Sequence, residues 1–185
     1  MGGGCFGFHF SLLTFHFSLS KMSKRAVLLD ALASMPQDVA FMLRRAEGTA
    51  VYHRPTPQEW SIADVLLHLA TMERLVLTQL QKIVQEERPF LPTLHPETQP
   101  EPDPRPLAEL VTAVHDTRQQ TLTFLHTLKA GDWQRTAVHE TLGATRFRFM
   151  VQLLVDHDTE HLNQIIEIQT RLKSHPANDI SPETA

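Results

Sequence analysis

Apolar residues recur at helical intervals in four segments of the chain, and the clearest of these segments is residues 150–172. At about 100° per residue, its apolar positions fall on one face of a helix: Met150, Leu153, Leu154, Ile165, Ile168 and Leu172. Similar stripes run through residues 24–47, 62–83 and 107–129. We therefore expect four amphipathic helices, the last of them over about residues 146–173.

Capping and helix-breaking residues mark where several of these helices begin and end. Ser61 followed by Asp64 is typical of a helix N-terminus, because each side chain can accept a bond from the other residue's backbone N–H. Gly48 and Gly131 are natural C-terminal stops. Pro36 lies inside the first segment and lacks a backbone N–H, so we expect a kink or a break into two pieces there.

Two segments between the helices do not follow a helical pattern. Residues 86–106 contain seven of the twelve prolines, which excludes a regular helix or a central strand and predicts a functional flap or a disordered spacer. Three apolar residues of this segment could still pack across one end of a bundle: Phe90, Leu91 and Leu94. Residues 131–145 predict a mixed turn region with a short hairpin or a helical turn, and with Trp133 docked on the helices.

Four amphipathic helices without a convincing strand pattern indicate an all-α fold, an antiparallel four-helix bundle. A chain of 185 residues, 42% of them hydrophobic, suits one domain that buries roughly 70% of its unfolded surface. We assign this domain to residues 22–174 and expect a disordered polar tail over residues 175–185.

The first 21 residues do not belong to this pattern. They are apolar and aromatic, but the positive charges that begin at Lys21 follow the apolar run, whereas a secretory signal needs them in front of it. The run is also too short and too often broken by His and Ser to span a bilayer. Since Met22 opens a conventional polar start, we interpret residues 1–21 as a non-domain extension from a misassigned start. A divergent signal or a membrane-surface anchor is the alternative.

Charge and cysteine content narrow the class of function. The net charge is −4, and the basic residues are scattered rather than gathered on one helix, which argues against a nucleic-acid partner. Cys5 is the single cysteine, so an intramolecular disulfide and a Cys-rich zinc site are excluded and a cytoplasmic location is favoured. We expect no membrane partner, and the sequence leaves a homodimer open.

Two histidines interrupt the last apolar stripe. His157 and His161 lie within roughly 20° of the centre of that face and about 6 Å apart along the helix axis, a spacing that lets two imidazoles bind one metal ion. Alternatively, both are hydrogen-bonded core residues, but each buried ring would then need partners for a donor and an acceptor. The residues alone leave both interpretations open.

Other histidines give weaker signals. His68 lies at the border of the stripe of its helix, where a side chain can face a cleft between helices or stay at the surface. His115 and His126 share a face of the third helix but are about 16 Å apart along it, too far to bind one ion. We interpret these last two as ordinary polar positions.

Two motifs combine these residues: Trp60-Ser61-x-x-Asp64-x-x-x-His68-Leu69 and His157-Asp158-x-x-His161-Leu162-x-Gln164-Ile165. Together, in this order and with the turn Leu142-Gly143 before the last helix, they resemble the DinB-like, or YfiT-like, superfamily of small four-helix proteins. The resemblance covers residues 24–172. It implies that His68, His157 and His161 bind a divalent metal ion, with zinc or nickel foremost and iron or manganese as further candidates.

The resemblance also implies a class of chemistry at that metal ion. The leading activity is transfer of a low-molecular-weight thiol, of the bacillithiol or mycothiol type, onto an electrophilic small molecule. A metal-dependent hydrolase that uses water is the alternative, and a non-catalytic metal-binding bundle is the third. Three neutral imidazoles leave a divalent ion with an open position, as in catalytic sites. Such an ion provides a nucleophile at neutral pH.

Side chains beside these histidines are candidates for supporting roles. Asp64, Asp158 and Glu160 could each hold the second N–H of a metal-binding histidine or act as a general base, or they are solvated or capping carboxylates. Gln164 is a candidate hydrogen-bonding residue of the pocket. We interpret Trp60 as a packing anchor, and the catalytic acid or base stays unassigned.

Overall fold

The computed structural model describes residues 23–46, 48–54, 56–94 and 103–174. In chain order its elements are α1 (Lys24–Leu43), η1 (Gly48–Tyr52), α2 (Ile62–Gln85), β1 (Phe90–Leu91), α3 (Leu107–Thr127), η2 (Asp132–Gln134), β2 (Thr136–His139), β3 (Gly143–Arg146) and α4 (Phe147–Ser174). The four predicted helices are confirmed, with boundaries within a few residues of those expected. The interpretations of residues 1–21 and 175–185 fall outside the described residues.

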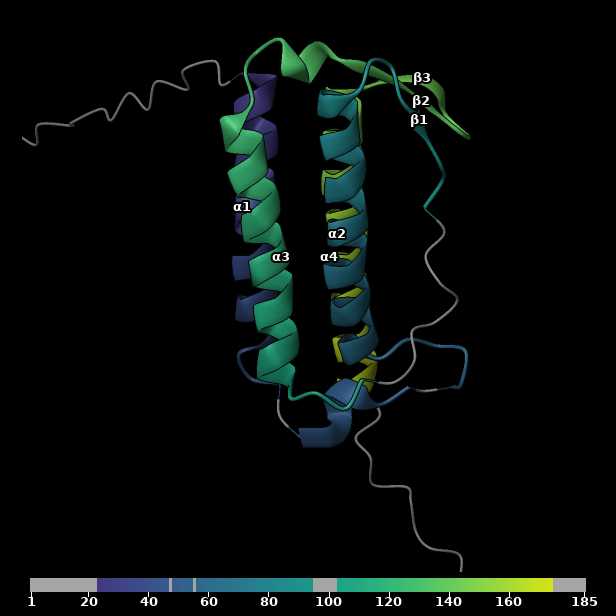
Figure 1. Ribbon diagram of the computed structural model, residues 1–185. Coiled ribbons are helices and arrows are strands. Elements are labelled where there is room, and N and C mark those ends of the chain that lie inside the picture. Colours follow the sequence, from purple (N-terminus) through teal and green to yellow (C-terminus); the bar gives the residue numbers. More distant parts are fainter. Residues whose placement is uncertain (1–22, 47, 55, 95–102, 175–185) are drawn as a thin grey trace, which may run out of the picture.

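The long helices form the predicted bundle, with α1 and α3 on one side and α2 and α4 on the other (Figure 1). Hydrogen bonds between helix ends fix their directions. Arg25, near the start of α1, donates to the carbonyl oxygen of Leu128 after α3 at 3.0 Å, so these neighbours are antiparallel. Gln169, near the end of α4, donates to the carbonyl oxygen of Met42 near the end of α1 at 3.0 Å, so that pair is parallel.

A second parallel pair follows from the long connection between α2 and α3. The hydroxyl of Tyr52, before α2, donates to the carbonyl oxygen of Arg105, just before α3, at 2.9 Å, so both helices begin at the same end. Arg171 in α4 pairs with Glu59 before α2 at 2.6 Å, which makes α2 and α4 antiparallel. The four-helix bundle is thus confirmed, but only two neighbouring pairs are antiparallel as predicted and two are parallel. The reason is that the proline-rich connection joins opposite ends of the bundle.

α1 continues through Pro36, so the break that the sequence predicts does not occur. Pro36 lacks the N–H that would bond the carbonyl oxygen of Leu32, four residues earlier. That oxygen instead accepts a hydrogen bond from Nη1 of Arg118 in α3, at 3.3 Å. A buried side chain of the neighbouring helix thus satisfies the freed backbone group, and the helix remains one element.

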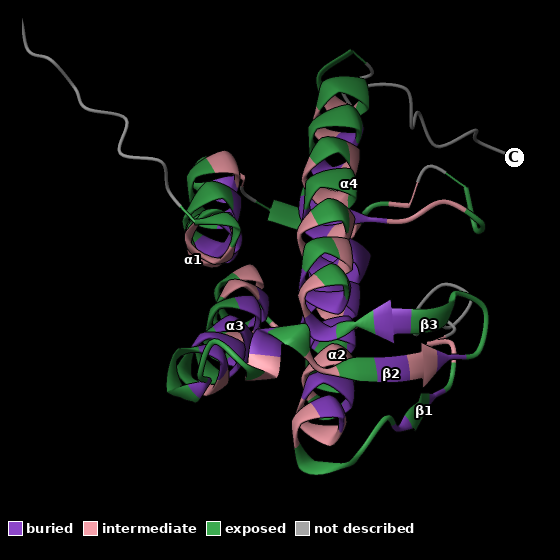
Figure 2. Cartoon of the chain, turned by 90° about the horizontal axis from the view of Figure 1, so that it is seen from above, coloured by how far each residue is buried: buried purple, intermediate pink, exposed green. Residues whose placement is uncertain are grey.

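A small three-stranded sheet, in the order β1-β2-β3, covers the end of the bundle beside α2 and α4 (Figure 2). Both alternatives expected for residues 131–145 occur, since η2 is a helical turn and β2 and β3 form a hairpin. Trp133 in η2 is buried against Phe147, with ring centroids 5.5 Å apart. β1 adds a parallel edge strand that the sequence did not predict. Pro89 and Pro92 flank β1, and because proline cannot continue the ladder they limit it to two residues.

The core consists of two apolar clusters, one toward the sheet and one toward η1. Between them each helix contributes to a polar layer. Glu73 of α2, Arg118 of α3 and Asp158 of α4 are all buried at this level, and the carbonyl oxygen of Leu32 in α1 completes it. Figure 2 shows how buried positions line the inside of the bundle, with exposed positions on its outside.

α1 is the one described helix that is long and apolar enough to cross a membrane by length and composition alone. Five of its apolar residues pack in the bundle core: Leu28, Leu32, Met35, Val39 and Leu43. The core helix of a soluble bundle passes the same composition test, so the apolar character of α1 is explained by its place in the core.

Candidate metal centre

Three histidines converge between the antiparallel helices α2 and α4. Nε2 of His68 lies 3.0 Å from Nε2 of His157, and one ring nitrogen from each of His68, His157 and His161 lies within 4.8 Å of the other two. The ring centroids are 4.5 to 5.2 Å apart. The structure therefore brings together the three residues that the family resemblance indicated, including His68 from the edge of its stripe.

Burial keeps two of these rings neutral. His68 is 8% exposed, and burial together with the charge of His161 lowers its pKa to about 4. Burial, the two other histidines and Arg118 lower the pKa of His157 to about 3. A neutral imidazole has a free lone pair on one nitrogen, which is the form that binds a metal ion.

Gln164 and Trp60 hold His161 in place. Nδ1 of His161 lies 2.7 Å from Oε1 of Gln164, one turn further along α4. An amide oxygen only accepts, so Nδ1 carries the proton and Nε2 is left with its lone pair. The Trp60 ring stacks on His161 at 6.1 Å and meets His68 edge-on at 5.0 Å. Trp60 thus packs on the histidines themselves, beside the helix start.

The carboxylates that the sequence placed near the histidines bond elsewhere. Asp64 completes a capping box with Ser61 and accepts two bonds from Arg54, at 2.6 and 2.7 Å. Burial alone would raise the pKa of Asp64, but these hydrogen bonds hold it below its ordinary value. Asp158 bonds Arg118 in the core, and Glu160 is exposed. No described contact joins any of these carboxylates to a histidine.

The sequence interpretation missed two members of the polar layer, Arg118 and Glu73. Nη2 of Arg118 donates to Oε2 of Glu73 at 2.7 Å, and the guanidinium donates twice to Asp158, at 2.8 and 2.9 Å. A signal was present in the sequence: Arg118 lies four residues from both Val114 and Leu122, in line with the apolar stripe of α3. A charged residue at such a position predicts a buried ion pair.

Electrostatics in this layer are unbalanced, because one guanidinium faces two carboxylates. Burial opposes the charge of Arg118, but Glu73 and Asp158 raise its pKa above the ordinary value. Burial raises the pKa of Asp158 to about 6, although the bonds from Arg118 oppose that shift. A buried carboxylate like that of Asp158 destabilises the fold when it is ionised, unless further positive charge lies nearby.

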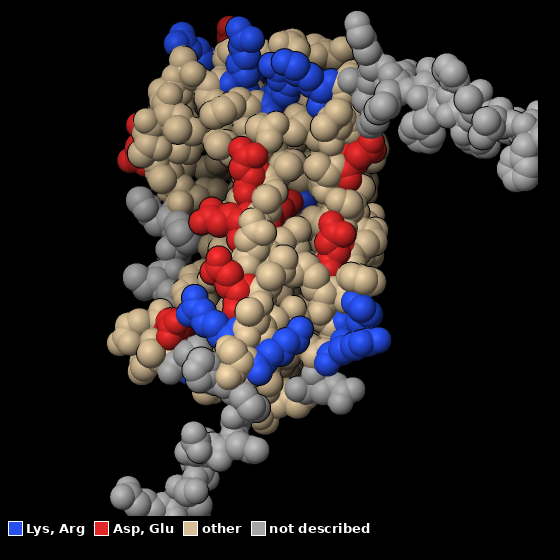
Figure 3. All heavy atoms as spheres, turned by 180° about the vertical axis from the view of Figure 1, so that it is seen from behind, with Lys and Arg blue, Asp and Glu red and all other residues tan. Residues whose placement is uncertain are grey.

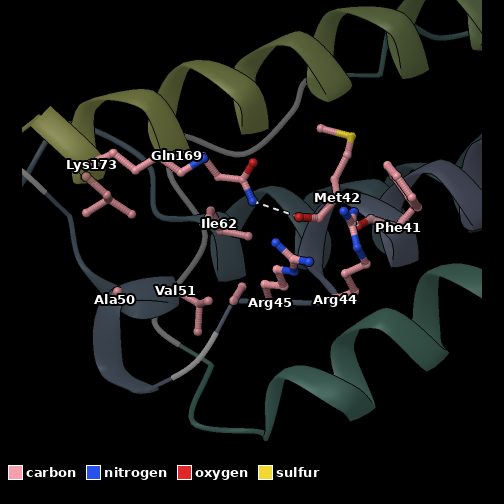
Figure 4. Close-up of a pocket in the computed structure, with 11 residues that line it drawn as sticks. Phe41, Met42, Arg44, Arg45, Ala50, Val51, Ile62, Gln169 and Lys173 are labelled. Atoms are coloured by element: carbon pink, nitrogen blue, oxygen red, sulfur yellow. Dashed lines mark hydrogen bonds between the residues drawn. The ribbon is translucent and has the colours of Figure 1, made fainter.

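Neither the two histidines predicted on the third helix nor the cavity drawn in Figure 4 belongs to this centre. His115 and His126 are exposed on α3. A cavity of about 480 Å³ lies where α1 and α4 end, between residues such as Ile62, Arg45 and Lys173 (Figure 4), and none of the three converging histidines lines it. Its basic side chains stand at helix C-termini, where they offset the negative end of the helix dipole.

Acidic and basic side chains occupy different parts of the outer surface. The face of the molecule shown in Figure 3 carries acidic side chains across its middle and basic side chains toward both ends. No continuous basic surface runs along this face of the described residues.

Comparisons with known proteins agree on fold. A family model described as the DinB superfamily matches residues 25–165. The structure of YfiT from Bacillus subtilis, described as a probable metal-dependent hydrolase with an unusual four-helix bundle topology, is similar with a TM-score of 0.68 and 16% identity, over 83% of this chain and 91% of that one. A DinB-like protein from Bacillus subtilis, YjoA, gives a TM-score of 0.54 and 14% identity, over 80% and 93%. No curated protein matches the chain.

Proposed function

The chain belongs to the DinB superfamily, and from this membership and its converging histidines we propose that it is a divalent-metal-dependent enzyme that transfers a low-molecular-weight thiol to an electrophile. The observation that carries the proposal is the convergence of His68, His157 and His161 between α2 and α4. The sequence resemblance on which the expectation rested is confirmed at the level of family and fold.

The arrangement of the rings fits a bound ion. Two Nε2 atoms face each other at 3.0 Å, and a zinc ion bonded to both at tetrahedral geometry would hold them roughly 3.3 Å apart. In the absence of an ion, one of the two nitrogens must carry a proton to make this contact favourable. The donor set consists of imidazoles, which zinc, nickel and iron(II) all accept, so the donors do not choose among these metals.

The described residues around the centre have distinct tasks in this proposal. His68, His157 and His161 would hold the ion through neutral imidazoles, and Gln164 fixes the proton of His161 on Nδ1. Trp60 supplies an apolar wall beside two of the rings. When bound, the ion would lower the pKa of a thiol or water that reaches it and so provide a nucleophile at neutral pH. His157 and His161 are partly exposed, which leaves an approach from solvent.

Thiol transfer requires a thiol from outside the described bundle, because the single cysteine of the chain is Cys5. The test is the loss of monochlorobimane in the presence of bacillithiol, mycothiol or cysteine. In this reaction a carbon–sulfur bond forms, the carbon–chlorine bond breaks, chloride leaves and the thiol proton passes to solvent. We expect turnover that needs both the thiol and a divalent ion and that is lost in His157→Ala. Turnover without thiol would contradict this reaction.

Hydrolysis is the second candidate, and the description of YfiT as a probable metal-dependent hydrolase favours it. Incubation of the metal-loaded protein with ester and amide substrates in the absence of thiol distinguishes hydrolysis from thiol transfer. Metal-dependent and thiol-independent hydrolysis would support this alternative. Metal binding with neither activity would support a non-catalytic metal-binding bundle. The proposal also includes small-molecule partners and a cytoplasmic location. The cytoplasm is reducing, so a small thiol substrate would stay in its reduced form there.

A further inference from the structure

Arg118, the cation of the polar layer, contacts all four helices. It is fully buried in α3, donates to Asp158 in α4 and to Glu73 in α2, and reaches the carbonyl oxygen of Leu32 in α1. The layer lies between the two apolar clusters. One cation and two carboxylates leave a negative excess in the core, next to the helix turn that carries His157.

Three atoms in or near this layer are buried and lack a hydrogen-bond partner in the described structure: Nδ1 of His157, Oε1 of Glu73 and Nε of Arg118. Nε of Arg118 always carries a proton and only donates, so it cannot accept the proton of His157. Nδ1 of His157 and Oε1 of Glu73 are chemically complementary. His157 turns Nε2 toward His68, so when Nε2 binds an ion the ring proton must sit on Nδ1. Oε1 of a carboxylate is an acceptor. A buried donor and a buried acceptor are each destabilising when they lack a partner, and a hydrogen bond between the two would remove both penalties.

The contacts of Arg118 bring these two atoms to one level of the bundle. Its Nη2 donates both to Oε2 of Glu73, at 2.7 Å, and to Oδ1 of Asp158, at 2.9 Å. The two carboxylates therefore lie within two hydrogen-bond lengths of each other. Asp158 directly follows His157 in α4. Arg118 is also close enough to His157 for its charge to act on the ring.

The other unpartnered buried oxygens in the described chain belong to different places. Oε1 of Gln79 is on α2 but six residues beyond Glu73, about 9 Å along the axis. Oγ1 of Thr145 belongs to β3 of the sheet. Among these unpartnered oxygens, that of Glu73 is the one that belongs to the polar layer beside His157.

We propose that Glu73 is a positioning residue for His157, whose Nδ1 proton its free oxygen accepts directly or through one water. This bond would fix the tautomer and orientation of the ring, as Gln164 does for His161. Arg118 and Asp158 hold Glu73 in place, and the negative excess of the layer offsets the charge of a bound ion. The inference rests on the proposed metal centre. It adds a hydrogen bond to Nδ1 of His157, the ring nitrogen that would not bind the ion.

The test is a double-mutant cycle on the affinity for Zn²⁺, measured by competition with a chromophoric chelator. In Glu73→Gln the single amide oxygen is needed by Nη2 of Arg118, which leaves the NH2 group, a donor, toward the Nδ1 proton of His157. Loss of a hydrogen bond to the second ring nitrogen of a metal-binding histidine typically lowers metal affinity about 10- to 100-fold, and we expect this for Glu73→Gln. In a His157→Ala background, measured at Zn²⁺ concentrations high enough to fill the weakened site, the same change should alter the affinity by less than about twofold, because the residue acts through that ring. The matched control is Glu160→Gln, an exposed acid on α4, which should leave affinity unchanged.

The outcomes separate the inference from the proposed function. If the wild-type protein binds no divalent ion, the metal centre itself is wrong. If it binds Zn²⁺ and Glu73→Gln binds equally well, or if Glu73→Gln weakens binding equally in both backgrounds, only the positioning role is wrong. Should Glu73→Gln fail to fold, ¹⁵N-edited NMR of the zinc-loaded wild-type protein decides. We expect a protected proton on Nδ1 of His157, and coordination through Nδ1 would overturn the inference.

Discussion

At the scale of single residues, each converging imidazole is one ligand of the proposed centre. Replacing His68 by alanine removes a ligand that comes from a different helix than the other two. We expect His68→Ala to lower divalent-ion affinity on the order of a hundredfold or more, measured by chelator competition. His115→Ala, which changes an exposed histidine of α3, is the control and should bind like the wild type. Equal loss in both variants would argue against a specific site.

The lowered pKa values of His68 and His157 predict an acid-sensitive apoprotein. Folded-state values of about 4 and about 3 lie below the ordinary value of 6.5, so the unfolded chain binds more protons between these limits. Stability should be fully present above about pH 6.5 and should fall as pH drops toward 4 and below. Urea unfolding of metal-free protein at several pH values measures this. His68→Phe should lose less stability than the wild type over that range; parallel curves would contradict the prediction.

The residues differ in how well the sequence alone identified them. His157 and His161 stand out because they interrupt the centre of an apolar stripe. His68 lies at the edge of its stripe, so only the family resemblance selected it. Gln164 was a correct candidate for a hydrogen bond near the site. The partner of Asp158 could not be predicted, because Arg118 comes from another helix and only the packing brings them together.

At the scale of elements, Arg118 joins the four helices, and its loss should leave two buried carboxylates without a cation. Removing one partner of a buried ion pair typically costs about 3–5 kcal/mol. We expect a decrease of this size in the free energy of unfolding for Arg118→Met, measured with urea. Arg74→Met, on the exposed side of α2, should change it by less than about 0.5 kcal/mol. Similar stabilities of the two variants would refute a structural role for the layer.

The hairpin that covers one end of the bundle depends on a left-handed turn residue. Gly143 has φ of +69°, and a Cβ there would meet nothing within 4 Å, so the cost of a side chain is that of the backbone alone. We expect Gly143→Ala to lower stability by about 1–2 kcal/mol in thermal unfolding. Gly131, with φ of −65° and equally open space, is the control, and its alanine variant should be neutral or slightly stabilising.

Helix positions followed from hydrophobic periodicity, whereas helix directions did not. The parallel packing of α2 with α3 arises because the 86–106 connection joins opposite ends of the bundle, and a stripe of apolar residues has no direction. β1 escaped prediction for a related reason. Two residues between prolines carry no pattern, and they become a strand only when β2 lies beside them. The continuity of α1 at Pro36 likewise depends on a side chain from α3.

At the scale of the whole molecule, an ion held between α2 and α4 would tie the two helices together. Binding to the folded state alone should stabilise it by about 2.7 kcal/mol when the free ion is at a hundred times its Kd. We expect Zn²⁺ to raise the melting temperature of the wild-type protein. The shift should vanish in His157→Ala and persist in His126→Ala, which changes an exposed histidine. A shift that survives in His157→Ala would place the bound ion elsewhere.

The most direct measurement is the metal content of purified wild-type protein beside that of His157→Ala, by inductively coupled plasma mass spectrometry. If three imidazoles from two helices hold one ion, the wild-type protein will contain close to one equivalent of a single divalent metal per chain and the variant little or none. Equal metal content in the two proteins, or none in the wild type after incubation with zinc and nickel, would contradict a metal centre at these histidines.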